Sequence, residues 1–273
     1  MMIQDIFPSR LDNSYGSRKA ADEKSFLMYI REGRLLADIR DGELRLPRLG
    51  EVSCSDAIYL FSVDGESFFL GTAEEDTCPE GYGFHNSREL RDRCTGKYLF
   101  AAFTAFHLAD WYASNRYCGR CRGEMVCDDS ERALVCRECG KKIYPRINPA
   151  VIVGVKNGDR LLITRYRTGF PHNALIAGFT EIGETLEQTA EREVMEEAGL
   201  RVKNIRYYKS QPWGVASDIL VGFFCEVDGS DEIKMDESEL RYAQWLGRDE
   251  IELQPNSHSL TNEMMKLFRD GEI

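Results

Sequence analysis

Three glutamates stand at helical spacing between residues 178 and 200. Glu193, Glu196 and Glu197 occupy positions i, i+3 and i+4, so a single helix would place their carboxylates on one face. Like charges on one face repel each other, and such a run usually marks a solvated helix surface. Hard divalent ions such as Mg²⁺ and Mn²⁺ prefer oxygen ligands and leave coordination positions for substrate phosphates. The spacing therefore indicates a divalent metal site, with a solvated acidic face as the alternative.

Four cysteines form a second set of candidate metal ligands. They stand as two Cys-x-x-Cys pairs that fourteen residues separate, Cys118 with Cys121 and Cys136 with Cys139. Each pair presents two thiolates to one ion, and two pairs complete the tetrahedral site that zinc prefers. All four positions would then be filled by protein, so we expect a structural zinc rather than a catalytic one. The alternatives are a redox-active pair of cysteines and a zinc ribbon that binds nucleic acid.

The elements that must position these residues follow from periodicity and turn chemistry. Asn157-Gly158-Asp159 favours a hairpin, residues 185–199 predict a helix that ends at a glycine, and a last helix should begin near Ser259. Four apolar runs predict strands, at residues 149–155, 161–164, 205–208 and 219–224.

Residues 1–115 contain no motif that we can assign to a function. Asp64-Gly65 lies between two apolar runs and predicts a tight hairpin. The stretch from about Leu90 to Ser114 places apolar side chains at helical spacing and predicts a packed helix. Such an apolar face is more typical of a core than of a cofactor site. We therefore expect an N-terminal mixed α/β domain whose role is unassigned.

Composition excludes several classes of protein. The 273 residues are 42% hydrophobic and 30% charged, which suits two globular domains and excludes wholesale disorder. A net charge of −11 argues against a protein that binds duplex nucleic acid through a basic surface. No apolar run approaches the length of about 18 residues that a membrane-spanning helix needs, and the first residues do not resemble a signal peptide. We expect a cytoplasmic protein with no membrane contact.

The glutamate segment resembles the Nudix box. Its pattern, Gly-x5-Glu-x7-Arg-Glu-aliphatic-x-Glu-Glu-x-Gly-aliphatic, is matched at every specified position by residues 178–200. The resemblance implies an α/β/α sandwich and metal-dependent hydrolysis of a nucleoside diphosphate linked to another moiety. It also implies that Glu193, Glu196 and Glu197 bind Mg²⁺ or Mn²⁺, and that Arg192 pairs with Glu184. One carboxylate would take a proton from the attacking water, and Glu197 is our first choice.

The context of the box is similar to the NADH pyrophosphatase subfamily. The cysteine pairs lie directly upstream, and both the linker at residues 144–150 and Ser210-Gln211-Pro212-Trp213 resemble subfamily segments. Such enzymes split NADH or NAD⁺ into nicotinamide mononucleotide and AMP, some remove NAD caps from RNA, and they are typically homodimers. The resemblance implies an N-terminal domain at residues 1–115, a zinc ribbon at 116–143 and a Nudix domain at 144–273.

Further site residues follow from the same resemblance. Phe179 matches an aromatic residue that stacks on the substrate base, and Tyr144 matches a tyrosine at the nucleotide pocket. Glu239 matches a second acidic position near the metals. Core packing is the alternative for the two aromatic residues, and a surface charge is the alternative for Glu239. Trp213 could stack on a base or fill a core.

The chain departs from the subfamily directly after Trp213. It reads Gly-Val-Ala-Ser-Asp where the subfamily has Pro-Phe-Pro-x-Ser, so Asp218 takes the place of the last serine and Ser217 stands one residue earlier. Both are candidate substrate contacts. The altered loop leaves ADP-ribose or another nucleoside diphosphate derivative open as the substrate. A zinc-ribbon protein that senses nucleotide without cleaving it is a further alternative, but all three metal-binding glutamates are present.

Overall fold

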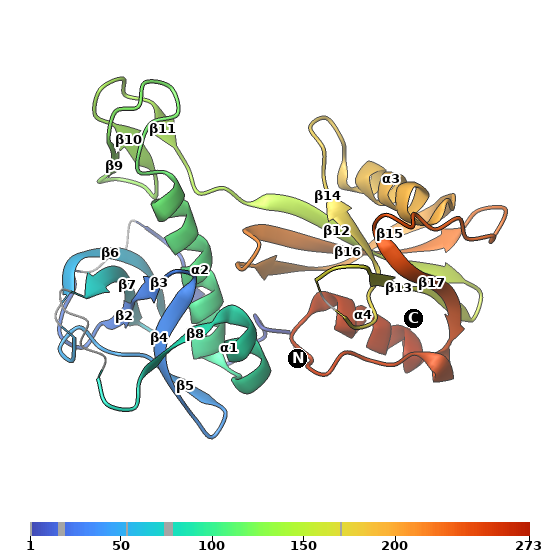
Figure 1. Ribbon diagram of the computed structural model, residues 1–273, viewed down its shortest axis with the longest axis horizontal. Coiled ribbons are helices and arrows are strands. Elements are labelled where there is room, and N and C mark those ends of the chain that lie inside the picture. The colour runs from blue at the N-terminus through green and yellow to red at the C-terminus, as the bar shows by residue number, and fades with distance from the viewer. Residues whose placement is uncertain (1, 16–19, 53, 74–78, 170) are drawn as a thin grey trace. The chain divides into compact units, whose positions relative to one another are not determined.

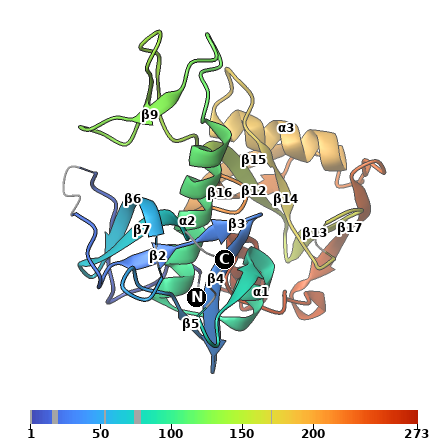
Figure 2. The same cartoon turned by 60° about the vertical axis from the view of Figure 1, so that its left-hand side comes forward.

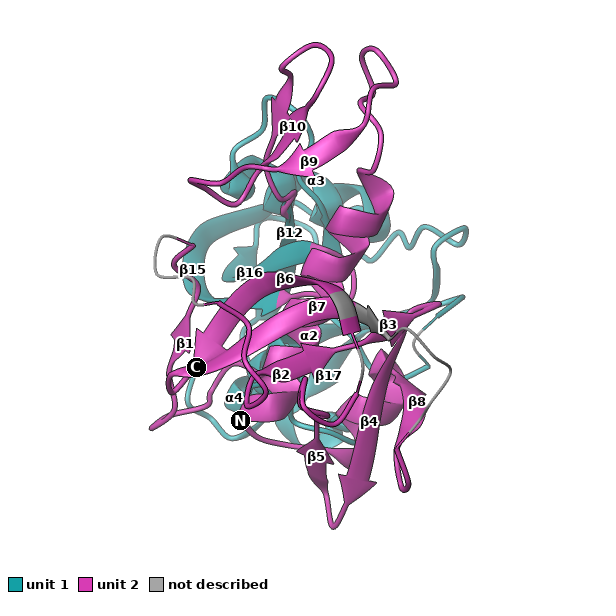
Figure 3. Cartoon of the chain, turned by 90° about the vertical axis from the view of Figure 1, so that its left-hand side faces the viewer, with its two compact units in different colours: residues 1–2, 148–212, 218–273 teal, residues 3–147, 213–217 magenta. Residues whose placement is uncertain are grey.

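The computed structural model describes residues 2–15, 20–52, 54–73, 79–169 and 171–273. The chain divides into two compact units (Figure 3). Unit 1 comprises Met1–Met2, Asn148–Pro212 and Asp218–Ile273, and unit 2 comprises Ile3–Ile147 and Trp213–Ser217. Within the described ranges, no helix is both long enough and apolar enough to cross a membrane. The division into three domains predicted from the sequence remains a prediction.

Unit 1 is built on a 6-stranded sheet of order β15-β16-β12-β13-β17, with β14 paired to β12. Its strands are β12 (Asn148–Asn157), β13 (Arg160–Tyr166), β14 (Ile176–Phe179), β15 (Val202–Trp213), β16 (Asp218–Val227) and β17 (Leu240–Gly247). Strand β12 runs parallel to β16 and antiparallel to β13 and β14. Gly158, in the turn between β12 and β13, has a φ of 60°. The predicted hairpin and the four predicted strands are therefore present.

Two helices cover opposite faces of this sheet (Figure 1). The helical elements of unit 1 are α3 (Leu186–Ala198), the 3-10 helix η1 (Arg248–Glu250) and α4 (Leu260–Arg269). Val151 and Val153 pack with Val194 of α3 on one face, whereas Ile152 packs with Met264 of α4 on the other. Successive side chains of a strand point to opposite faces, so β12 serves both cores. This arrangement is the predicted α/β/α sandwich.

Helix α3 has a capping interaction at each end. The Thr185 hydroxyl accepts a hydrogen bond from the Gln188 N–H at 3.2 Å, and the Gln188 side chain accepts one from the Thr185 N–H at 2.9 Å. This reciprocal pair satisfies two donors at the helix N-terminus. At the other end Gly199 is left-handed, with a φ of 68°. The helix predicted at residues 185–199 is confirmed, and α4 likewise begins after Ser259, whose side chain caps it.

Among its described residues, unit 2 contains two 4-stranded sheets and a 3-stranded one. The first sheet has β1 (Leu11–Asp12), β6 (Cys54–Val63), β7 (Glu66–Ala73) and β2 (Phe26–Met28), and the second has β3 (Ile30–Arg31), β4 (Arg34–Arg40), β5 (Glu43–Arg45) and β8 (Gly83–Asn86). The third has β9 (Met125–Cys127), β10 (Leu134–Cys136) and β11 (Lys142–Ile143). Asp64 and Gly65 join β6 to β7 with φ values of 52° and 81°, as expected for the predicted tight turn.

Helices α1 (Ser87–Arg93) and α2 (Lys97–Ser114) belong to unit 2. Helix α2 lies beside β6 (Figure 2). Phe100 and Phe103 of α2 belong to one core cluster with Phe61 of β6 and Phe68 of β7. The helix predicted from about residue 90 to 114 is confirmed over α2, but it does not extend back to residue 90, because the chain leaves the helical conformation between α1 and α2. Gly96 has a φ of 84° there, a conformation that an L side chain disfavours and that interrupts a right-handed helix.

Candidate functional site

Arg192 holds three glutamates and the loop before α3 together. Its Nε donates to Glu184 Oε1 at 2.6 Å, and its Nη2 donates to Glu184 Oε2 at 3.0 Å and to the Phe179 carbonyl at 2.9 Å. Its Nη1 donates to Glu193 Oε1 at 2.7 Å and to Glu196 Oε2 at 3.0 Å. The bond from Arg192 lowers the pKa of Glu184 to about 2. A planar guanidinium with five donors suits this role, because one side chain can bind several carboxylates at once.

Glu193 is buried against β14, where a glycine leaves room for it. A Cβ atom built on Gly178 would lie 2.0 Å from Cδ and from Oε1 of Glu193, so no residue with a side chain fits there without displacing the carboxylate. Only 9% of Glu193 is exposed. Burial raises the pKa of Glu193, and Arg192 opposes that shift. The glycine of the motif therefore has a direct steric reason.

Glu197 is more deeply buried than Glu193, with 2% of its surface exposed. The Tyr166 hydroxyl lies 3.3 Å from each of its carboxylate oxygens, and the Ala177 N–H donates to Oε1 at 3.4 Å. Burial raises the pKa of Glu197 to about 8, and the charges of Glu193 and Glu239 add to this shift. A carboxylate with a pKa near neutral can exchange a proton efficiently at physiological pH.

Glu196 and Glu239 complete the acidic group from the solvent side. Both are exposed. Glu196 is held through Arg192, whereas Glu239 directly precedes β17 and raises the pKa values of Glu193 and Glu197 by its charge. Strand pairing in unit 1 thus brings this distant acid within electrostatic reach of helix α3. Glu239 therefore adds to the negative charge around Glu193 and Glu197, and its role as a metal ligand remains a prediction.

These carboxylates suit a divalent cation. Two of them are buried with raised pKa values, and burying a charged carboxylate without full compensation costs free energy. Arg192 supplies one positive charge against Glu184, Glu193 and Glu196, so negative charge remains in excess. Oxygen donors with excess negative charge are the ligands that Mg²⁺ and Mn²⁺ prefer. The residues present therefore fit the predicted catalytic ion.

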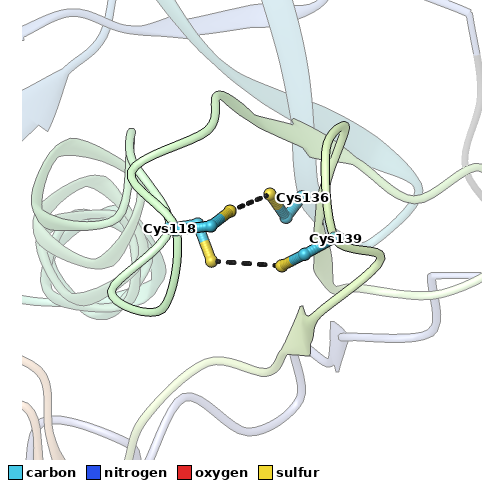
Figure 4. Close-up of side chains that lie close together, drawn as sticks. Cys118, Cys136 and Cys139 are labelled. Carbon is cyan, nitrogen blue, oxygen red and sulfur yellow. Dashed lines mark hydrogen bonds between the residues drawn. The ribbon is translucent and has the colours of Figure 1, made fainter.

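The four cysteines of the ribbon converge on one point. Their Sγ atoms all lie within 4.8 Å of one another, and no other group of three or more Cys, His, Asp or Glu ligand atoms in the described part of the chain is gathered in this way. The sulfur atoms of Cys118 and Cys139 are 3.7 Å apart (Figure 4). Those of Cys121 and Cys136 are 3.4 Å apart. Tetrahedral zinc with bonds of about 2.3 Å separates its sulfur ligands by about 3.8 Å. The cluster therefore fits a four-coordinate zinc ion.

Backbone donors favour the thiolate form within this cluster. The Arg120 N–H donates to Cys118 Sγ at 3.4 Å and lowers the pKa of that thiol. The second turn closes through the Gly140 N–H, which donates to the Cys136 carbonyl at 3.0 Å. Gly140 has a φ of 68°, which glycine adopts without strain. Deprotonated sulfur is the form that binds zinc, so the turns support the metal site chemically as well as sterically.

The two aromatic candidates for substrate binding have exposed rings but belong to different units. Phe179 ends β14 in unit 1 and is 53% exposed, and its carbonyl is fixed by Arg192. Tyr144 follows β11 in unit 2 and is 56% exposed. The Tyr144 hydroxyl donates to Glu131 Oε1 at 3.1 Å. Neither ring fills a core, so the core-packing alternative does not apply to them.

Trp213 packs against α2 within unit 2. Its ring meets Phe103 edge to face, with ring centroids 5.5 Å apart, and it lies against the main core cluster of that unit. The next residue, Gly214, approaches the helix so closely that a Cβ atom would lie 2.0 Å from the Phe103 carbonyl oxygen. This contact favours the core-packing alternative for Trp213. It also gives a steric reason for glycine where the subfamily has proline.

Asp218 is buried at the start of β16, where it pairs with Asn148 of β12. Only 5% of Asp218 is exposed, and its Oδ1 has no hydrogen-bond partner among the residues that the structure describes. Burial raises the pKa of Asp218 to about 6. Ser217, which precedes it, is half-buried with a φ of 57°. A buried polar atom without a partner is costly, so Asp218 Oδ1 is suited to bind a ligand group.

No sequence pattern pointed to Tyr166 or Glu131 as functional residues. Tyr166 lies two residues beyond the strand predicted at 161–164, although the structure extends β13 to it, and Glu131 is one acid in a polar loop of the ribbon. Their contacts with Glu197 and Tyr144 arise from strand pairing and from the fold of the ribbon. Such contacts join residues that are far from adjacent in sequence, and motif spacing carries no information about them.

Comparisons with known proteins agree with this geometry. The NUDIX domain family matches residues 146–268. The chain is 38% identical over 182 residues to the NAD-capped RNA hydrolases NudC of Escherichia coli O1:K1 / APEC and of Shigella flexneri, an alignment that covers 66% of this chain and 69% of each relative. A crystal structure of a NUDIX hydrolase from Nitrosomonas europaea aligns with a TM-score of 0.50 and 22% identity over 57% of this chain and 92% of that one. This last similarity supports the fold alone.

Proposed function

The chain belongs to the NUDIX family, and from that premise we propose that it hydrolyses the diphosphate of NADH and NAD⁺ to nicotinamide mononucleotide and AMP. Removal of NAD caps from RNA would use the same cleavage. One observation carries the proposal: the complete acidic group around Arg192 lies in a chain that is 38% identical to NAD-capped RNA hydrolases. An intact acidic group argues against a protein that senses nucleotide without cleaving it.

We propose that Glu193, Glu196 and Glu197, with Glu239, hold the catalytic Mg²⁺ or Mn²⁺. When bound, such an ion supplies charge neutralisation of the diphosphate and makes water more acidic. Arg192 keeps its contacts with Glu184 and the Phe179 carbonyl, so the loop before α3 stays fixed during turnover. This rigidity preserves the geometry that in-line attack on phosphorus requires.

Glu197 is our candidate for the general base. Its buried carboxylate receives the proton of the attacking water, the water oxygen forms a bond to phosphorus, and the bridging P–O bond breaks. The two products then leave as nicotinamide mononucleotide and AMP. Tyr166 and the Ala177 N–H fix the orientation of this carboxylate. A raised pKa matches the residue to proton transfer near neutral pH.

We propose that Phe179 and Tyr144 provide aromatic surfaces on which the planar groups of the dinucleotide stack. Asp218 would accept a hydrogen bond from a carboxamide or an exocyclic amine, because its Oδ1 lacks a partner in the described residues. Ser217 is a second polar candidate beside it. Trp213 is better suited to hold this loop on α2 than to contact substrate.

The remaining parts of the proposal rest on the resemblance to the NADH pyrophosphatase subfamily and on the residue types of this chain. The four cysteines would hold a structural Zn²⁺. A homodimer, a cytoplasmic location and the absence of membrane contact are carried over from the sequence as predictions. The departure at residues 214–218 keeps ADP-ribose as an alternative substrate, because it changes the segment that precedes β16.

A substrate panel tests the proposal. The protein is incubated with Mg²⁺ or Mn²⁺ and with NADH, NAD⁺, ADP-ribose, diadenosine polyphosphates or NAD-capped RNA, and kcat/KM is compared after product analysis. We expect NADH among the best substrates, with equal amounts of reduced nicotinamide mononucleotide and AMP. Preference for ADP-ribose over NADH would overturn the substrate assignment and leave the reaction class in place.

A further inference from the structure

We propose that Glu131 of the zinc ribbon positions Tyr144 for substrate binding, so that the ribbon contributes to substrate affinity. The inference rests on the proposed function, since it takes Tyr144 as a stacking surface. Glu131 itself need not touch the substrate. It acts as a positioning residue through the hydroxyl of Tyr144.

A chain of polar contacts ends on the Tyr144 hydroxyl. That hydroxyl donates to Glu131 Oε1 at 3.1 Å, and the same oxygen accepts a hydrogen bond from Lys142 Nζ at 2.7 Å. Lys142 Nζ also lies 2.6 Å from Asp128 Oδ2. The lysine therefore bridges two carboxylates and holds Glu131 in place. The bond to Glu131 raises the pKa of Tyr144, so the hydroxyl remains a donor.

The ribbon fold sets the geometry of this chain of contacts. Strand β11, which carries Lys142, pairs with β10 in the register Val135↔Lys142, and Tyr144 directly follows β11. In the loop that carries Glu131, Asp128 Oδ1 accepts hydrogen bonds from the backbone N–H groups of Ser130 and Glu131. The loop that presents Glu131 is thus closed by local bonds, within the same sheet whose strand β10 ends at a cysteine of the metal cluster.

An anchored tyrosine is a better stacking surface than a free one. Its ring is 56% exposed, so the faces are accessible to a planar ligand while the hydroxyl is held. A free ring would lose rotational freedom on binding, and this loss reduces affinity. Fixing the ring in advance removes that cost, and tyrosine suits the role because it has only two side-chain torsions. Glu131 should therefore affect binding more than the chemical step.

A double-mutant cycle on the full-length protein tests this coupling. KM and kcat for NADH are measured for the wild type, Glu131→Ala, Tyr144→Phe and the double variant. We expect each single variant to raise KM threefold to tenfold, about what one hydrogen bond contributes, with little change in kcat. Because both changes break the same bond, the double variant should be no worse than Tyr144→Phe alone. Glu131→Gln keeps an acceptor oxygen and should stay within about twofold of wild type.

Matched controls separate this role from general damage to the ribbon. Glu124→Gln removes another exposed ribbon carboxylate, one that pairs with Arg137 and not with Tyr144, and should leave KM unchanged. Zinc content and melting temperature are measured for every variant. Lys142→Met releases Glu131 from its other side and should raise KM in the same direction, which keeps the test decisive if Glu131→Ala loses zinc.

Two results would overturn the inference. One is a Glu131→Ala variant with wild-type KM, and the other is a double variant whose KM is the product of the two single effects. Either result would leave NADH hydrolysis by the wild type intact. A wild-type protein that does not hydrolyse NADH would instead contradict the proposed function, so the two failures can be told apart.

Discussion

The Tyr166 hydroxyl lies 3.3 Å from both carboxylate oxygens of Glu197. The tyrosine ends β13 and the glutamate lies in the last turn of α3, so the contact joins the sheet to the helix that covers it. In a buried site with little water, such a bond determines which way a carboxylate points. The relationship makes Tyr166 a positioning residue for the proposed base, although no motif in the sequence includes it.

Tyr166→Phe should lower kcat fivefold to tenfold with KM nearly unchanged. The substitution removes only the hydroxyl, and a hydrogen bond contributes about 1 kcal/mol net, which corresponds to roughly this factor. Steady-state kinetics with saturating Mg²⁺ measures the effect. Tyr207→Phe removes a hydroxyl from an exposed tyrosine of β15 and is the matched control. A Tyr166→Phe enzyme with full kcat would show that Glu197 is oriented without this bond.

Glu197→Gln should reduce turnover by orders of magnitude with the fold intact. Gln keeps the size of the side chain and can still accept the bond from Tyr166, but it cannot take a proton from water. General base catalysis contributes about 10² to 10⁴ in rate, which sets the expected loss. Single-turnover kinetics and circular dichroism measure activity and fold.

The control for this substitution is another acid of the same helix. Glu191 is exposed on α3, so Glu191→Gln removes a like charge outside the acidic group around Arg192. It should retain nearly full turnover. Near-normal activity of purified Glu197→Gln would move the role of base to another carboxylate of the group.

Local elements of the site were predictable from sequence, because their signals are local. Helix α3 is specified by a capping residue at Thr185, a left-handed glycine at Gly199 and the apolar positions between them. The cysteine ligands are specified by the spacing of two short turns. In each case residues close in sequence decide the structure, so the pattern alone was sufficient.

Contacts between distant segments were not predictable in this way. The burial of Asp218 depends on its pairing with β12, and the packing of Trp213 depends on α2, more than a hundred residues earlier. One sequence without pairing information cannot specify either contact. The break at Gly96 was missed for a different reason, since a single glycine inside an apolar periodic run is often tolerated within a helix.

Removal of zinc should raise KM without abolishing hydrolysis at saturating substrate. The four cysteines leave no coordination position for a reacting water, so the ion supports the ribbon rather than the reaction. Cys136→Ser should bind less zinc, lower the melting temperature and release the strand pairing that presents Tyr144. Metal analysis, thermal melting and NADH kinetics in excess Mg²⁺ measure these effects. A zinc-depleted enzyme with wild-type KM would show that the ribbon is dispensable for substrate binding.

Asp218→Asn should change how stability depends on pH. The folded protein raises the pKa of Asp218 from 3.8 to about 6 by burial, so the folded state holds this proton more tightly than the unfolded chain does. The contribution of the protonated Asp218 to the free energy of unfolding is complete below about pH 4, and it is lost as the pH rises through 6. Between pH 5 and pH 7 the free energy of unfolding of the wild type should fall by about 1 kcal/mol relative to that of Asp218→Asn, which carries no titrating group at this position. Urea unfolding at the two pH values measures the difference.

The control for this prediction is Asp228→Asn, at an exposed acid directly after β16, which should show no such change relative to wild type. Equal pH dependence in wild type and Asp218→Asn would mean that the Asp218 carboxylate is already ionised and compensated in the folded protein.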